Sequence, residues 1–297
     1  LLVDVGTNAE IVLGNRHRLV ACSSPTGPAF EGAQISCGQR AAAGAIERIR
    51  IDPVTLEPRF QVISCELWSD EEGFDTAIEK TGITGICGSG IIEVVAEMYL
   101  AGVITQDGVV DGSLAATNPR IQPDGRTFSY EIMPSTETRG AVKIMQNDIR
   151  AIQLAKAALY AGVKLLMQYQ QVDKVDRIRF AGAFGSHIDV KYAMVLGLIP
   201  DCALNEVSSA GNAAGTGARI ALLNEASRAE IEQVVRSIEK IETAVEPDFQ
   251  QLFIDAMAFP NKVDAFPELE KVVTLPPLKE ASAESENGDK KRRRRRG

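Results

Sequence analysis

The first 13 residues, LLVDVGTNAEIVL, place the strongest constraint on what this chain can fold into. Apolar residues on both sides of Gly6, Thr7 and Asn8 predict two antiparallel strands joined by a tight turn. An aspartate at the end of a buried strand, here Asp4, can hold a metal ion or a water molecule. Glycine lets the backbone approach an anion, and Thr7 and Asn8 offer donors to phosphate oxygens. The segment is therefore either an anion-binding hairpin or an ordinary hairpin turn without a ligand.

Composition narrows the class of protein. A chain of 297 residues with 45% hydrophobic content can bury a sizeable core in one or two domains. The net charge of −8 gives no general attraction to nucleic acid, and no apolar run approaches the ~20 residues of a membrane span. The five cysteines include no C-x-x-C pair, which favours reduced thiols in a cytoplasm over a disulfide framework or a zinc or iron–sulfur site. We therefore expect a cytoplasmic protein that binds neither membrane nor nucleic acid.

Alternating short strands and long helices predict an α/β layered fold. Ile49–Ile51 and Phe60–Ile63 are expected to form a hairpin, and apolar side chains at helical spacing run from Asp148 to Gln170. A helix is also expected over Ile91–Ala101. Residues 107–139, rich in Gly, Pro and Thr, are expected to be a polar excursion on the surface.

Two glycine-rich segments follow in the second half of the chain. A strand at Arg177–Phe180 leads into Ala181–Gly185, where adenine and ribose could lie flat against the backbone. Ser209–Ala218 passes into a helix and offers free amides. Both segments could equally be tight packing sites. Neither has the Gly-Lys-Ser/Thr of a Walker A loop or the spacing of a dinucleotide fingerprint.

Two further residues have a functional and a structural interpretation. Glu31, in the turn Gly27–Gly32, could orient water or Mg²⁺, or it could be an exposed carboxylate without a role. Cys87 has no histidine nearby in the sequence, which favours a small buried thiol at a helix start over a nucleophile.

The order of these segments resembles the second lobe of an actin-like ATPase, the superfamily of sugar kinases and Hsp70. In that resemblance Asp4–Asn8 corresponds to the second phosphate loop, Ala181–Gly185 to the adenosine loop, and Gly211–Ala218 to the second connecting helix. It implies an α/β fold of the actin-like (ribonuclease H-like) kind, mostly the second lobe, with a mixed sheet flanked by helices.

Longer motifs make the resemblance more specific. The chain is similar over about residues 1–260 to the C-terminal domain of the reductive activators of corrinoid proteins. The motifs that carry this likeness are Leu2–Asn15, Gly27–Ala33, Gly85–Gly90, Gln146–Arg150, Gln153–Ala158 and the two glycine-rich segments.

The resemblance implies ATP with Mg²⁺ as cofactors, and it assigns the site residues. Asp4 and Glu31 are expected to be catalytic, and Asp4 also to bind the metal. The residues expected to bind nucleotide are Gly6, Thr7, Asn8, Gly182, Ala183, Gly185, Gly211, Asn212 and Gly215.

The function implied is ATP-dependent reduction of a corrinoid protein from Co(II) to Co(I). The chain would be the part that responds to nucleotide and docks the partner, either a corrinoid protein or a corrinoid-dependent methyltransferase. The electron would come from a [2Fe–2S] domain that this chain lacks, so the chain by itself is not expected to transfer electrons. Two alternatives stay open: an actin-like scaffold without nucleotide turnover, and a small-molecule kinase of the same superfamily. The oligomeric state, a homodimer included, also stays open.

The chain divides into three expected parts. Residues 1–260 form the ATPase-like domain, interpreted as a fragment without its first lobe because the chain starts inside a strand without a methionine. Residues 261–279 form an extension. Residues 280–297 are acidic and then basic, ending in Lys290–Arg296. With no apolar residues to bury, this stretch is expected to be a disordered, solvated tail, with binding to nucleic acid or to an acidic protein surface as the alternative.

Overall fold

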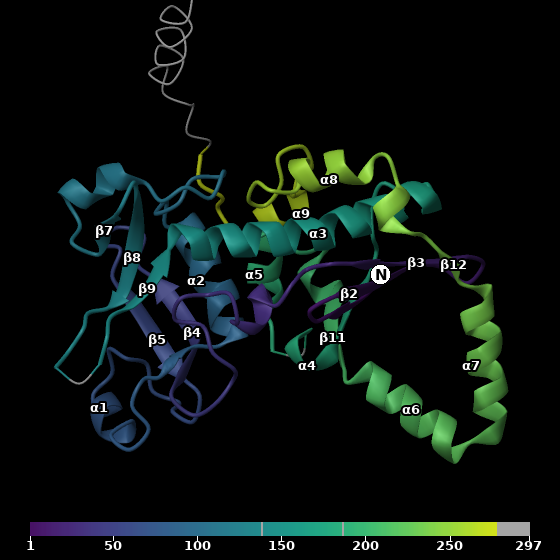
Figure 1. Cartoon of the computed structure of the whole chain (residues 1–297), viewed down its shortest axis with the longest axis horizontal. Helices are drawn as coiled ribbons and strands as arrows, with labels where there is room; N and C mark the ends of the chain where they lie inside the picture. Colours follow the sequence, from purple (N-terminus) through teal and green to yellow (C-terminus); the bar gives the residue numbers. More distant parts are fainter. Residues whose placement is uncertain (138, 186, 278–297) are drawn as a thin grey trace, which may run out of the picture.

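A computed structural model describes residues 1–137, 139–185 and 187–277, so the tail expected at 280–297 lies outside the described residues. The molecule has two halves, each built on β-sheet, and the long helix α3 (Gln146–Gln170) runs along both of them (Figure 1). Along the described part of the chain, no helix has both the length and the apolar character needed to cross a membrane.

The first half is a six-stranded mixed sheet in the order β11-β10-β1-β2-β3-β12. Strands β1, β2 and β3 form an antiparallel meander, while β10 and β11 run parallel to β1, and β12 runs parallel to β3. The bounds are β1 (Leu2–Val5), β2 (Ala9–Gly14), β3 (Leu19–Ser24), β10 (Ile178–Ala181), β11 (Val207–Gly211) and β12 (Glu239–Lys240). The hairpin expected in the first 13 residues and the strand expected before Ala181 are confirmed.

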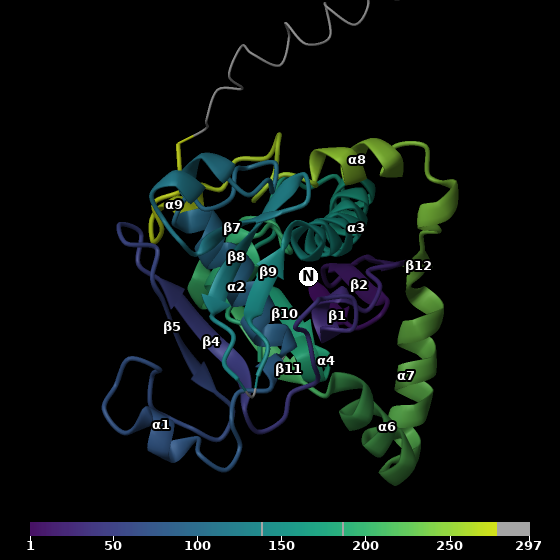
Figure 2. The same cartoon turned by 60° about the vertical axis from the view of Figure 1, so that its left-hand side comes forward.

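The second half is inserted between β3 and α3 and contains two three-stranded sheets, β5-β4-β6 and β7-β8-β9 (Figure 2). Its strands are β4 (Ala45–Ile51), β5 (Pro58–Val62), β6 (Gly85–Ile86), β7 (Ile121–Asp124), β8 (Thr127–Met133) and β9 (Val142–Met145). Strands β4 and β5 are the antiparallel hairpin expected from the sequence. Helix α2 (Gly88–Leu100) packs against β4, and it begins three residues earlier than expected.

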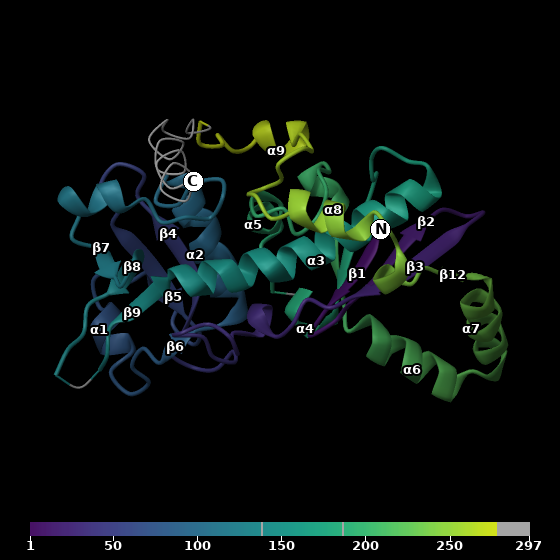
Figure 3. The same cartoon turned by 45° about the horizontal axis from the view of Figure 1, so that its top comes forward.

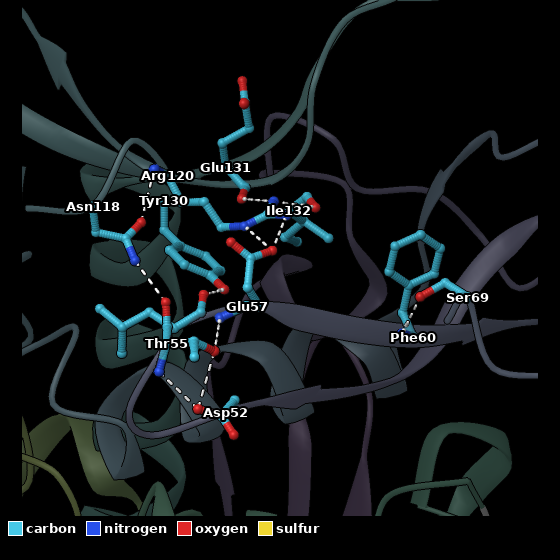
Figure 4. Close-up of polar contacts among 11 residues, drawn as sticks. Asp52, Thr55, Glu57, Phe60, Ser69, Asn118, Arg120, Tyr130, Glu131 and Ile132 are labelled. Atoms are coloured by element: carbon cyan, nitrogen blue, oxygen red, sulfur yellow. Dashed lines mark hydrogen bonds and ion pairs between the residues drawn. The ribbon is translucent and has the colours of Figure 1, made fainter. Parts of the chain in front are cut away.

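The surface excursion expected at residues 107–139 is wrong in part, because strands β7 and β8 of this region form a sheet with β9 and place several side chains in the core. Tyr130 of β8 is fully buried, and its hydroxyl donates to the carbonyl oxygen of Leu56 at 2.8 Å. Arg120 ties the same region to the β4–β5 turn by donating to Glu57 and to the carbonyl oxygens of Glu131 and Ile132 (Figure 4). Isolated apolar residues among Gly, Pro and Thr gave no periodic pattern from which this long-range pairing could be read.

Helix α3 connects the halves and carries the stripe expected from the sequence. It packs against β2 and β3 of one half and against β8 and β9 of the other (Figure 3). Asp148 closes its first turn, since its carboxylate accepts a hydrogen bond from the Met145 amide at 2.8 Å. The other oxygen of Asp148 accepts from the Ser36 amide at 2.8 Å, which fixes the segment between β3 and β4 to the start of the helix.

Helices α6 (Ala213–Leu223) and α7 (Glu225–Ser237) contain no buried residue. In all three views they loop away from the six-stranded sheet and return to its opposite edge at β12 (Figures 1–3). The sequence placed the helix after the second glycine-rich segment at Arg219–Leu223, whereas it already begins inside that segment at Ala213.

The C-terminal described residues return to the core. Lys156 of α3 is fully buried and donates to the carbonyl oxygen of Pro260 at 2.8 Å, and Phe266 and Leu269 are also buried. The boundary expected at residue 260 stays a prediction. The remaining helices are α1 (Phe74–Ala77), α4 (Gly182–Gly185), α5 (Val190–Val195), α8 (Phe249–Asp255), α9 (Pro267–Glu270) and the 3-10 turns η1 (Ala29–Glu31), η2 (Gly112–Ala116), η3 (Leu204–Glu206) and η4 (Thr243–Val245).

Candidate functional site

Asp4 lies near the carboxyl end of β1, at a point set by the register of its neighbours. It is paired with Glu10 of β2 on one side and with Ala181 of β10 on the other. Because β1 and β10 are parallel, their carboxyl ends open at the same edge of the sheet, where α/β folds usually bind ligands. The sheet therefore brings Asp4 next to the loop that follows Ala181.

The turn after Asp4 is fixed by backbone hydrogen bonds. The Gly6 amide donates to the carbonyl oxygen of Asn8 at 3.0 Å, and the Gly27 amide donates to the carbonyl oxygen of Thr7 at 2.9 Å. The Thr26 hydroxyl donates to the carbonyl oxygen of Gly6 at 2.7 Å. The predicted phosphate loop is therefore held by the segment that leaves β3, and the side chains of Thr7 and Asn8 stay exposed.

Glu31 is connected to this loop by its side chain. It ends η1, which is anchored by the buried ring of Phe30 next to it. The Thr7 hydroxyl donates to Glu31 Oε1 at 3.0 Å. Thr7 and Glu31, both expected at the site from the sequence, are thus brought together.

Gly182 lies directly against Asp4. It has a φ of +82°, and a Cβ at this position would lie 2.4 Å from Asp4 Oδ1. Any other residue would meet both the strain of the left-handed region and a collision with the carboxylate. Ala183 follows within α4, and Gly185 is buried, with its Cβ position 3.1 Å from Phe180 Cβ. Gly182 therefore makes room for the Asp4 carboxylate, whereas Gly185 allows close packing.

Three of the predicted site residues open onto one cavity between the two halves, with a volume of about 730 Å³. Its described lining residues do not include Gly6, Thr7, Asn8 and Gly185, which were also predicted to bind nucleotide. Asp4, Glu31 and Gly182 all line it, although they lie far apart in the sequence. The other lining residues are Val5, Phe30, Gln39, Arg40, Ala41, Glu47, Ile63, Cys87, Gly88, Ser89 and His187. A cavity of this size fits a small-molecule ligand such as a nucleotide.

The inserted half contributes cavity residues that sequence reasoning missed, chiefly Gln39, Arg40, Glu47 and Ser89. Gln39 is held by its amide, which donates to the carbonyl oxygen of Ile86 at 2.9 Å, and by its side chain, which donates to Thr84 Oγ1 at 2.9 Å. The motif Gly85–Gly90, which includes Ser89, could have indicated that the inserted half contributes to the site, but the sequence analysis assigned it no ligand.

Cys87 is the residue before α2 and is buried, with 1% of its surface exposed. Its Sγ donates to the carbonyl oxygen of Ile46 at 3.3 Å, and it also lies 3.3 Å from Ser89 Oγ. The sequence-based interpretation of Cys87 as a buried thiol at a helix start is confirmed.

The second glycine-rich segment lies elsewhere. Gly211, Asn212 and Gly215 are not among the residues that line the cavity. Asn212 caps α6, since its Oδ1 accepts from the Gly215 amide at 2.8 Å. A Cβ at Gly211, where φ is +62°, would meet nothing within 4 Å. The assignment of these three residues to nucleotide binding stays a prediction.

The carboxylates of the cavity suit a magnesium ion that is shared with phosphate. Mg²⁺ usually keeps several waters and binds through one or two carboxylates plus substrate phosphates. Asp4 and Glu31 offer two such groups on one cavity. No group of three or more His, Cys, Asp or Glu residues within the described ranges could hold a metal ion by itself, so the cavity fits a phosphate-bound Mg²⁺ better than an all-protein metal site.

Known proteins resemble this chain in sequence and in structure. A family model described as the C-terminal domain of RACo, the ASKHA domain, matches residues 1–270. The corrinoid activation enzyme RamQ of Eubacterium limosum is 32% identical over 272 residues, which is 89% of this chain and 43% of RamQ.

Two further relatives agree with that match. A [Co(II) methylated amine-specific corrinoid protein] reductase of Methanosarcina barkeri is 23% identical, over 94% of this chain and 50% of the reductase. A solved structure of a reductive activator for corrinoid, iron–sulfur protein superposes with a TM-score of 0.73 at 32% identity, over 88% of this chain and 39% of the activator. The chain thus spans half or less of the length of these relatives, and the expected actin-like α/β fold is confirmed.

Proposed function

This chain belongs to the family of RACo C-terminal ASKHA domains, and from that premise we propose that its central cavity binds ATP with Mg²⁺. The observation that carries the proposal is that Asp4, Glu31 and Gly182 line one cavity of about 730 Å³. The site combines a turn whose groups can donate to phosphate, two carboxylates, and a loop in which a glycine leaves space. A nucleotide with its metal ion requires groups of these kinds.

Each residue has a definite task in this proposal. Asp4 and Glu31 would hold the Mg²⁺ ion, which would supply positive charge next to the phosphates when bound. The backbone of Gly6–Asn8 faces the phosphate oxygens. The Thr7 hydroxyl can donate one hydrogen bond, and it donates this bond to Glu31. If the hydroxyl donated to a phosphate oxygen instead, Glu31 would lose this partner. Gly182 keeps space for the Asp4 carboxylate beside the ligand.

The names of the relatives support a proposal for the cellular role. Their names describe activation or reduction of corrinoid proteins, so we propose that this chain couples ATP to reduction of a corrinoid protein from Co(II) to Co(I) in the cytoplasm. The partner is a corrinoid protein, either free or within a methyltransferase. The electron comes from a [2Fe–2S] group outside this chain, since the chain provides only isolated thiols among its described residues.

The test is reactivation of a purified corrinoid protein held in the Co(II) state. Full-length protein, a chemical reductant and Mg²⁺ are mixed with ATP, with ADP, or without nucleotide, and the Co(I) absorption band is followed. We expect Co(I) to form several times faster with ATP than without it. A matched reaction with the Asp4→Asn variant should lose the dependence on ATP.

Equal rates with and without ATP would contradict the coupling and favour a docking scaffold without nucleotide turnover. Transfer of phosphate from ATP to a small molecule, with no effect on the corrinoid, would favour a kinase.

A further inference from the structure

The charges that line the cavity are unbalanced. Asp4, Glu31 and Glu47 contribute three carboxylates, whereas Arg40 contributes the one guanidinium among the lining residues. A polyphosphate that enters such a cavity meets repulsion from the carboxylates, which bound Mg²⁺ relieves only around the ion itself. A second positive group aimed at the ligand would therefore matter for affinity.

Arg40 differs from its arginine neighbours in the inserted half. Arg48 and Arg50 are both paired with the buried Glu93, at 2.6 and 2.5 Å, and Arg120 is paired with Glu57. Among the described residues, Arg40 has no hydrogen-bond or ion-pair partner. Its guanidinium is exposed, and all of its donors are free for a ligand.

The backbone beside Arg40 is anchored, which gives the side chain a fixed starting point. Gly38 forms a β-bridge with Ile86, and the Gln39 amide donates to the same residue at 2.9 Å. The backbone amide of Gln39 thus donates to β6, and its side-chain amide donates to Thr84. Arg40, the next residue, lines the same cavity as Asp4.

We propose that Arg40 is the anion-binding residue of the cavity and contacts a phosphate oxygen of a nucleoside di- or triphosphate. The inference rests on the proposed nucleotide site and adds the residue that recognises the charge of the ligand. Guanidinium groups bind phosphate oxygens through two parallel hydrogen bonds. Gly88 and Ser89, at the first turn of α2, line the same cavity and place the positive end of that helix dipole on the same side.

The test compares ligands that share adenosine and differ in the number of phosphate groups. Calorimetry on the full-length protein measures Kd for Mg·ATP, Mg·ADP and adenosine in wild type, Arg40→Gln and Arg40→Lys. A matched control, Arg126→Gln, removes another exposed arginine, from the β7–β8 turn, which does not line the cavity. Melting temperatures show that each variant is folded.

We expect Arg40→Gln to weaken Mg·ATP binding about tenfold, with adenosine binding and the melting temperature unchanged. Arg40→Lys should lose less, because it keeps the charge without the paired donors. Unchanged Kd for Mg·ATP in Arg40→Gln, or an equal loss for adenosine, overturns the assignment of Arg40 while leaving the nucleotide site standing. Failure of wild type to bind Mg·ATP overturns the nucleotide site and this inference with it.

Discussion

Two glycine-rich segments that look alike in the sequence have different surroundings in the folded chain. Ala181–Gly185 and Gly211–Gly215 each follow one of two adjacent parallel strands, β10 and β11, and each enters a helix. Gly182 lies against Asp4 and lines the cavity, whereas Gly211 has open space around its Cβ position. The position of the preceding strand accounts for the difference: β10 pairs with β1, which carries Asp4, while β11 forms the edge of the sheet.

The comparison shows what a glycine motif can and cannot indicate. Glycine identifies a place where the backbone adopts a positive φ or another group approaches closely, and both segments contain a glycine with positive φ. The ligand is determined by what lies opposite. A carboxylate lies opposite Gly182, and the amide of Asn212, which caps its own helix, lies opposite Gly215.

The largest expected effect concerns Asp4. In the full-length protein, Asp4→Asn should reduce ATPase turnover by about 10²–10³-fold, because it removes one positioned electrostatic group. The matched control is Glu10→Gln, a carboxylate paired with Asp4 across the strands that does not line the cavity. If the two variants lose activity equally, Asp4 has no special role at the site.

A smaller effect is expected at Gly182. Gly182→Val should weaken Mg·ATP binding at least about tenfold, since the added Cβ would lie 2.4 Å from Asp4 Oδ1 and displace the carboxylate from its place at the cavity. Gly211→Val meets the same positive φ without a neighbour and should change the affinity less than about twofold. Calorimetry on both variants tests the comparison directly, and equal losses would assign both segments to the nucleotide.

Thr7 tests the link between the phosphate loop and Glu31. Thr7→Val removes the hydroxyl that donates to Glu31 at 3.0 Å. We expect the ATPase rate to fall by up to about tenfold, the usual range for one hydrogen bond. Thr7→Ser keeps the hydroxyl and should retain most of the rate. A serine variant as slow as the valine variant would show that the methyl group of Thr7, and not its hydroxyl, matters.

The smallest effect on nucleotide is expected at Asn212. Asn212→Ala removes the cap of α6, worth about 1 kcal/mol of local stability. Hydrogen exchange at the Gly215 amide should accelerate, while Kd for Mg·ATP should stay within about twofold of wild type. A large loss of affinity in this variant would instead support the prediction, made from the sequence, that the second glycine-rich segment binds nucleotide.

The sequence predicted local elements better than the contacts between distant ones. The stripe of α3, the first hairpin and the strand before Ala181 have regular spacing and were confirmed. Tyr130 and the strands around it were missed, because their packing depends on contacts with Leu56 and Glu57, which lie more than 60 residues earlier in the chain.

The candidate site was predicted from one wall only. Asp4, Glu31 and Gly182 belong to motifs with recognisable chemistry. Arg40 and Glu47 on the other wall come from an inserted region whose position against the sheet is set by tertiary packing, and an exposed arginine gives no periodic signal.

The central claim is that nucleotide occupies the cavity at Asp4 and Gly182. Hydrogen–deuterium exchange of the full-length protein, with and without Mg·ATP, tests it most directly, because each segment reports its own protection. We expect slower exchange at residues 4–8, 29–31 and 181–185, and no change at 211–217. Protection at 211–217 with none at 4–8 would contradict the account.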